Sequence, residues 1–190
     1  RFFFDEYLVD DVKVELFNLF KEVAEQILSW KPKIVGMSLF SYVSQSSAKW
    51  LAWFIKKIDP SVIIILGGAG CLPTFTGPSV YADDLISAGW VDYHIRGDGE
   101  HALYEFLKNN REYAGINSLE WRELSKDELR SLPMPDYSQY YFDTYQKKVL
   151  PLTGSRGCVR KCTFCDYIAN WKVFNWRTAD DIYNEMQAQY

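Results

Sequence analysis

Apolar residues in the first 117 positions follow two alternating patterns. The run 61–66 (SVIIIL) is an unbroken β-branched stretch, typical of a strand buried on both faces of a parallel sheet. The stretch 44–58 instead has helical periodicity, with one apolar stripe formed by Ala48, Leu51, Ile55 and Ile58. Further strands are predicted at 33–40 and 91–96, and further helices at 79–87 and 100–108. Strands alternating with helices predict an α/β fold over residues 1–117, a Rossmann-like doubly wound parallel sheet.

The flanking segments have different patterns. A helical pattern at 14–28 is expected to cover the sheet. Residues 118–147 are predicted to be a linker, because Pro133 and Pro135 fix φ and exclude a helix around 132–137. Residues 148–190 begin with a predicted short buried strand at 149–153. They end in a predicted helix, which begins at a T-x-x-D capping signal formed by Thr178 and Asp181. Its apolar face is formed by Ile182, Met186 and Tyr190.

Composition narrows the range of partners. The net charge of -4 and the pI near 5.3 argue against a dominant nucleic-acid surface. Aromatic residues make up 17% of the chain, which predicts a large core or a shared interface. The sequence shows neither a secretory signal nor an apolar span long enough for a membrane helix, so a cytoplasmic protein without a membrane partner is expected.

Three of the four cysteines form a C-x3-C-x2-C motif at Cys158, Cys162 and Cys165. Three thiolates can hold three irons of a four-iron cluster and leave one iron open. An iron without a protein ligand can bind a small molecule and act on it chemically. Gly154 and Gly157 precede the motif and would allow the backbone to wrap a cluster closely.

Zinc and disulfide interpretations fit the cysteines less well. Zinc prefers four ligands, commonly in two Cys-x2-Cys pairs or with histidines, and only Cys162 and Cys165 form such a pair. Neither His94 nor His101 has ligand spacing to another residue. A reducing cytoplasm disfavours disulfides. Cys71 is most simply a small buried residue.

The loop, with Phe164 just before its last cysteine, resembles the cluster loop of the radical S-adenosylmethionine (radical SAM) enzymes. The resemblance implies a [4Fe-4S] cluster held by the three cysteines, with S-adenosylmethionine chelating the open iron and cleaved to a 5′-deoxyadenosyl radical. The Phe164 backbone would approach the adenine, and its ring would pack beside the cluster or in the core.

The resemblance also implies an electron donor such as flavodoxin or ferredoxin. Basic residues of the loop would offset the cluster charge or face this donor, or they form a solvated surface (Arg156, Arg160 and Lys161). Residues 148–190 would start a partial (β/α) barrel of about 200 residues, so the chain is expected to be an inactive fragment of a longer enzyme.

A second resemblance concerns the predicted sheet. Ligands of such sheets bind beyond the carboxyl ends of the strands. Ser38 and Phe40 after one strand, followed by Gly67 and Gly68 after the next, resemble the motifs of cobalamin-binding domains. In that family the serine lines the pocket for the nucleotide tail, and the glycines let the tail pass close to the backbone. A generic Rossmann-like turn is the alternative.

The function predicted from these features is that of a cobalamin-dependent radical SAM enzyme. Its expected reaction is methyl transfer to an unactivated carbon of an unidentified small-molecule substrate, and no catalytic residue is assigned. One alternative is a radical SAM enzyme without cobalamin that catalyses cyclisation, sulfur insertion or another rearrangement. The other is a nonenzymatic iron–sulfur or zinc module that recognises a partner.

Overall fold

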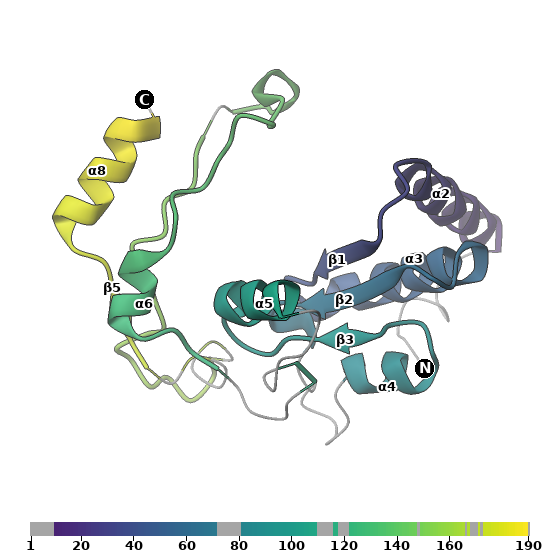
Figure 1. Cartoon of the computed structure of the whole chain (residues 1–190), viewed down its shortest axis with the longest axis horizontal. Helices are drawn as coiled ribbons and strands as arrows, with labels where there is room; N and C mark the ends of the chain where they lie inside the picture. Colours follow the sequence, from purple (N-terminus) through teal and green to yellow (C-terminus); the bar gives the residue numbers. More distant parts are fainter. Residues whose placement is uncertain are drawn as a thin grey trace. The chain divides into compact units, whose positions relative to one another are not determined.

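The computed structural model describes residues 10–71, 81–109, 116–117, 122–147, 149–165, 167, 171 and 173–189. The chain divides into two compact units, Arg1–Arg122 and Glu123–Tyr190. Figure 1 shows the three-stranded sheet in the first unit and, in the second, the helices at 126–131 and 179–189.

The first unit is built on a parallel sheet with the strand order β1-β2-β3 (Figure 1). The strands are β1 (Ile34–Ser38), β2 (Ile63–Gly67) and β3 (Tyr93–His94). β1 and β2 pair from Ile34 opposite Ile63 to Ser38 opposite Gly67. The predicted α/β fold with a parallel sheet is therefore confirmed.

The third strand is shorter than the predicted segment 91–96. Its start is shortened because the Asp92 carboxylate accepts the Ile64 N–H at 2.7 Å, the place where a backbone carbonyl would extend the ladder. Beyond the strand, Ile95 still donates its N–H to the Leu66 carbonyl at 2.8 Å. On the other side of the strand, Asp92 lies in a bend and donates its N–H to the Ile64 carbonyl at 3.0 Å, so backbone hydrogen bonds to β2 continue beyond the two residues of β3.

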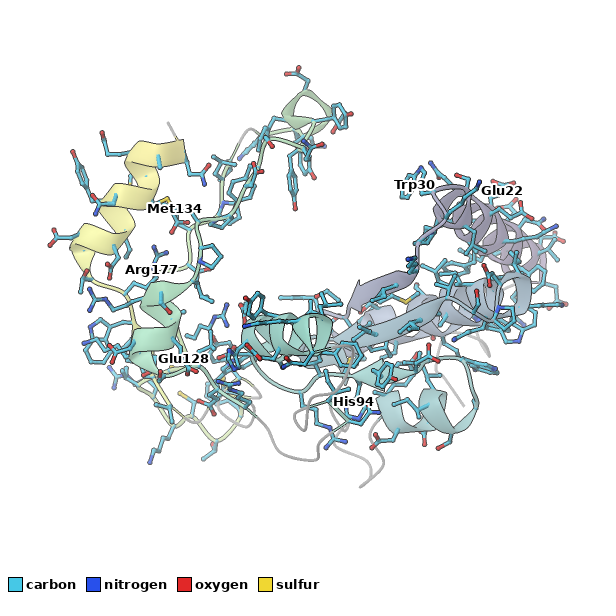
Figure 2. All side chains as sticks on the ribbon, in the orientation of Figure 1. Glu22, Trp30, His94, Glu128, Met134 and Arg177 are labelled. Atoms are coloured by element: carbon cyan, nitrogen blue, oxygen red, sulfur yellow. The ribbon has the colours of Figure 1, made fainter. Side chains whose placement is uncertain are left out.

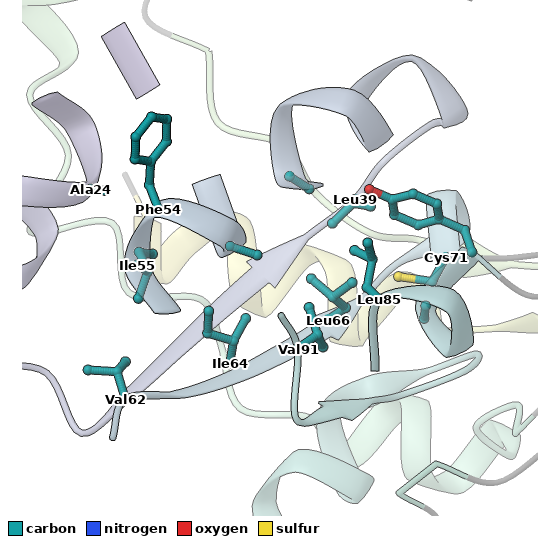
Figure 3. Close-up of a cluster of buried hydrophobic side chains, with 14 residues drawn as sticks. Ala24, Leu39, Phe54, Ile55, Val62, Ile64, Leu66, Cys71, Leu85 and Val91 are labelled. Carbon is teal, nitrogen blue, oxygen red and sulfur yellow. The ribbon is translucent and has the colours of Figure 1, made fainter. Parts of the chain in front are cut away.

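Helices cover both faces of the sheet, as a doubly wound fold requires. They are α3 (Gln45–Ile58), α4 (Tyr81–Ser87) and α5 (Gly99–Lys108). Ile64 and Leu66 belong to the core cluster that contains α3 and α4 side chains, shown in Figure 3. Ile65 points to the opposite face, where it packs with Ala102 and Phe106 of α5. This alternation explains why β2 is apolar at every position.

The first described helix, α2 (Asp10–Ser29), packs mainly against α3 rather than on the sheet. The Phe17 ring contacts an aromatic cluster of α3 at centroid distances between 4.7 and 6.3 Å (Trp50, Trp53 and Phe54). The sheet face is thus covered by α3, and α2, which was expected to cover the sheet, lies mainly on α3 instead. No helix in the described part of the chain is both long and apolar enough to cross a membrane.

The second unit contains α6 (Lys126–Ser131), a 3-10 turn at Phe142–Thr144, β4 (Ser155–Arg156), β5 (Asn175–Trp176) and α8 (Ala179–Gln189). α6 lies inside the segment predicted to be a linker. It starts with a capping box, in which Ser125 Oγ accepts the Glu128 N–H at 3.2 Å and Glu128 Oε2 accepts the Ser125 N–H at 2.9 Å. Residues 133–137 form neither helix nor strand, as their prolines predicted.

The predicted barrel strand at 149–153 is wrong, because these residues form no strand and Val149 is 68% exposed. A buried barrel strand needs parallel neighbours. The described residues of this unit offer only the antiparallel pair β4–β5. The predicted capped helix is confirmed as α8: Asp181 donates its N–H to Thr178 Oγ1 at 3.2 Å, and Thr178 donates its N–H to Asp181 Oδ2 at 2.8 Å. Of its predicted apolar face, Met186 is 53% exposed and Tyr190 lies outside the described residues.

Candidate functional site

The cysteine loop, residues 157–174, connects β4 to β5 and is closed at its base by the pairing of these two strands. Ser155 lies opposite Trp176 and Arg156 lies opposite Asn175. Gly157 follows β4 with a φ of 80°, and a Cβ there would lie 2.0 Å from the Val173 carbonyl oxygen. Only glycine tolerates both the left-handed conformation and this contact. The approach of the chain to its own backbone thus accounts for Gly157, and the wrapping of a cluster by Gly154 and Gly157 stays a prediction.

Three interactions order the loop. Gly157 donates its N–H to the Tyr167 hydroxyl at 3.3 Å, and the Tyr167 ring stacks on Trp171 with 4.8 Å between centroids. Cys165 donates its N–H to the Cys162 carbonyl at 3.2 Å, which forms a tight turn between the last two cysteines.

The three cysteines of the motif are free thiols and are half-buried. The Arg160 N–H points at Cys158 Sγ, with 3.4 Å between nitrogen and sulfur. The described residues include no group of three or more His, Cys, Asp or Glu side chains arranged to hold a metal ion. The structure thus places the predicted ligands on one loop without gathering their sulfur atoms at one point. Three thiols with a backbone N–H directed at sulfur suit an iron–sulfur cluster, whose binding is coupled to local folding.

The rim of the loop is basic and partly apolar. Arg160 and Lys161 are exposed, and the side chains of Val159 and Phe164 are 70% and 89% exposed. The Phe164 ring therefore lies at the surface of its unit instead of in a core. Its placement beside a cluster and adenine stays a prediction.

Arg177 connects the segment that leads into the loop with α8. Its N–H donates to the Gly154 carbonyl at 2.9 Å, and its Nη1 donates to the Thr153 carbonyl at 3.2 Å. The same Nη1 binds Glu185 Oε2, and Nη2 donates to the Asp181 carbonyl at 3.3 Å. Figure 2 shows Arg177 beside α8. The sequence did not predict a role for Arg177, because no short motif identifies an ion pair between residues eight positions apart, one before the start of a helix and one within it.

Asp181 joins α6 to α8. Arg130 Nε donates to its Oδ2 at 2.8 Å, and Arg130 Nη2 donates to its Oδ1 at 3.4 Å. The hydrogen bond from Arg130, followed by those from Thr178, holds the pKa of Asp181 well below its usual range. The carboxylate therefore serves as a helix cap and as the link between the two helices.

The carboxyl edge of the sheet brings together two of the residues assigned to cobalamin. Ser38 lies directly opposite Gly67, at the ends of β1 and β2. A Cβ at Gly67 would meet nothing within 4 Å, whereas one at Gly68 would lie 2.3 Å from the Leu39 carbonyl oxygen. Gly68 is thus explained by chain packing and its φ of 94°, while Gly67 leaves open space beside the backbone. The Phe40 side chain is 90% exposed.

A polar cluster at the end of β3 joins the buried residues His94 and Arg96 to the half-buried Asp83, and no sequence motif predicted it. His94 is fully buried, with its Nε2 2.8 Å from Asp83 Oδ1 on α4 (Figure 2). Arg96 Nη2 donates to Asp83 Oδ2 at 2.9 Å. Burial lowers the pKa of His94, against the opposing effect of Asp83. The neutral imidazole therefore donates through Nε2 and ties α4 to β3, which is a structural role.

Two curated proteins are similar to this chain in sequence. No family model matches the chain, and no solved structure matches it. A curated relative from Rubrivivax gelatinosus, named anaerobic magnesium-protoporphyrin IX monomethyl ester cyclase, is 22% identical over 187 residues, covering 87% of this chain and 32% of the relative. A relative of the same name from Cereibacter sphaeroides is 23% identical over 190 residues, covering 88% of this chain and 29% of its own length. The chain thus spans about a third of these relatives, both of which are named as enzymes.

Proposed function

We propose that this chain is part of a radical SAM enzyme whose cluster is held by Cys158, Cys162 and Cys165. The observation that carries the proposal is the placement of three free thiols on one loop, with the base of that loop fixed by β4–β5. When bound, the [4Fe-4S] cluster would supply the electron that cleaves S-adenosylmethionine. The similarity to two enzymes named as cyclases supports an enzymatic role over a purely structural metal module.

The comparisons favour ring formation over methyl transfer. Both relatives are named as cyclases that act on a magnesium-porphyrin ester. Methyl transfer, the reaction expected from the sequence, has no support from these names. A tetrapyrrole ester is therefore the first substrate class to test with the intact protein.

Cobalamin is proposed for the sheet edge at Ser38 and Gly67. The support is the pairing of these residues and the open space beside Gly67. After incubation with hydroxocobalamin and desalting, the intact protein should retain a corrinoid absorption band, and Gly67→Trp should lose it. Leu107→Trp, on the exposed side of α5, is the matched control and should retain the band. Equal retention by Gly67→Trp and wild type would place the pocket elsewhere.

The electron for the cluster is proposed to come from an acidic carrier such as flavodoxin or ferredoxin. Arg160 and Lys161 are exposed on the cysteine loop and would attract such a partner. Replacing both by glutamine should slow cluster reduction by the carrier at low ionic strength, while reduction by dithionite stays unchanged.

Anaerobic reconstitution tests the central proposal. The intact protein, supplied with iron and sulfide, should bind about four irons per chain. The EPR signal of its reduced cluster should change when S-adenosylmethionine is added. Cys162→Ser should lose most of the bound iron, whereas Cys71→Ser should keep it. Zinc retained in place of iron, or an EPR signal indifferent to S-adenosylmethionine, would contradict the radical SAM assignment.

A further inference from the structure

The Arg177 guanidinium bonds to two parts of the second unit at once. On one side it donates to the Thr153 carbonyl, five residues before Cys158. On the other side it binds Glu185 and the Asp181 carbonyl of α8. The side chains of Arg177 and Glu185 are only 12% and 2% exposed, so the pair is shielded from water.

A buried ion pair is an inefficient way to stabilise a helix. Two apolar side chains of similar volume commonly stabilise a fold as well or better, because burying charges requires their desolvation. What an apolar pair cannot do is direct hydrogen bonds to chosen carbonyls. A guanidinium offers five donors in a rigid planar fork, which lets it hold Glu185 and the Thr153 carbonyl in one geometry.

The segment that Arg177 contacts leads directly into Cys158, the first cysteine of the motif. Thr153 and Gly154 lead into β4, and β4 ends at Arg156, two residues before Cys158. The ladder β4–β5 has only two residue pairs, and so short a ladder is marginal by itself. The Arg177 contacts extend this ladder toward the chain start and anchor it on α8.

We infer that Arg177 is a positioning residue for the cysteine loop, with Glu185 as its counter-ion, and this inference rests on the proposed cluster function. It acts through the Thr153 carbonyl and fixes where β4 begins. The direction in which Cys158 leaves the sheet follows from that start. Arg177 touches neither the proposed cluster nor a substrate.

Three variants of the intact protein and one control variant separate positioning from stabilisation. Arg177→Met leaves the Glu185 charge buried and unpaired, so this variant should be strongly destabilised. The double variant Arg177→Met with Glu185→Leu removes both charges and should recover an unfolding temperature close to that of wild type. Arg177→Lys keeps the charge but lacks the fork, and it serves if the double variant folds poorly. Arg130→Met removes an ion pair with a more exposed arginine in the same unit and is the control.

The main readouts are hydrogen exchange of the 153–157 amides and alkylation of Cys158, both measured without cluster. In the double variant we expect exchange about tenfold faster than in wild type, the effect of losing one charge-assisted hydrogen bond. Cys158 alkylation should accelerate in parallel, and reconstituted protein should lose iron faster to a chelator. Arg130→Met should match wild type in all three.

Wild-type exchange and alkylation in a folded double variant, or in Arg177→Lys if the double variant does not fold, would overturn the inference and leave the pair a stabilising contact only. If wild-type protein binds no iron, the proposed function fails. The exchange and alkylation measurements still decide whether Arg177 holds the loop, because they do not need the cluster.

Discussion

At the scale of single residues, two adjacent glycines have different physical reasons to be glycine. Gly68 has a φ of 94°, and its Cβ would lie 2.3 Å from the Leu39 carbonyl oxygen. Gly68→Ala should therefore lower the free energy of unfolding by about 2 kcal/mol or more, since a left-handed alanine and a backbone clash add together. Urea unfolding of the chain measures this change.

Gly67→Ala is the matched control for this prediction. Its Cβ would meet nothing within 4 Å, so we expect a change in the free energy of unfolding of only about 0.5 kcal/mol. Equal destabilisation by the two alanines would show that Gly68 is not constrained by the Leu39 contact.

The four cysteines should divide by reactivity. Cys71 is fully buried, and burial raises the pKa of its thiol to about 12, so the reactive thiolate is scarce at pH 8. The three loop cysteines are partly exposed. Iodoacetamide at pH 8 should thus alkylate three cysteines in the folded, cluster-free protein and four in urea, as mass spectrometry would count. Alkylation of Cys71 in the folded protein would contradict its burial.

At the scale of elements, α8 depends on its capping box. Thr178 Oγ1 accepts the Asp181 N–H at 3.2 Å, and Thr178→Ala removes this acceptor. Loss of an N-cap side chain typically lowers the stability of a helix by about 1 kcal/mol. Exchange of the first α8 amides should therefore accelerate about fivefold, as read by hydrogen exchange. Asn184→Ala, at an exposed position within the same helix, should leave these amides unchanged. An unchanged rate in Thr178→Ala would show that the Thr178 hydroxyl does not protect the helix start.

The elements that could be predicted from the sequence are those with enough residues to show a period. β2 and α3 were recognisable because an unbroken β-branched run and a helical stripe each repeat several times. β4 and β5 have two residues each and carry no period, so the sequence suggested a strand at 149–153 instead. The T-x-x-D signal located α8 correctly, and the equivalent S-x-x-E signal at Ser125 would have located α6.

From the sequence, only the identity of the proposed ligand residues of the candidate site could be predicted. The spacing of Cys158, Cys162 and Cys165 needs no fold to be read, and the facing of Ser38 and Gly67 follows from parallel strands. The Arg177–Glu185 pair could not be predicted, since it depends on how α8 packs on the segment before β4. For the same reason the sequence did not reveal the bond between His94 and Asp83, which links β3 to α4.

At the scale of the whole molecule, the two units are stabilised by different forces. All of the buried apolar side chains described lie in Arg1–Arg122 except Leu124 and Leu129. Glu123–Tyr190 has mainly polar contacts, such as Arg130 with Asp181 and Asn175 Nδ2 with the Leu124 carbonyl, and ring contacts such as Tyr167 with Trp171. Polar contacts of this kind add little net stability in water, so burial of apolar surface should decide which unit folds alone.

Separate expression of the two units tests this division. Residues 1–122 should unfold cooperatively in urea, followed by circular dichroism, because both core clusters lie within them. In metal-free buffer, residues 123–190 should unfold at a lower urea concentration than residues 1–122, since only two apolar side chains of their described part are buried, Leu124 and Leu129. If iron and sulfide then raise the urea midpoint of residues 123–190, cluster binding adds folding free energy to this unit. A metal-free midpoint of residues 123–190 equal to that of residues 1–122 would contradict the division.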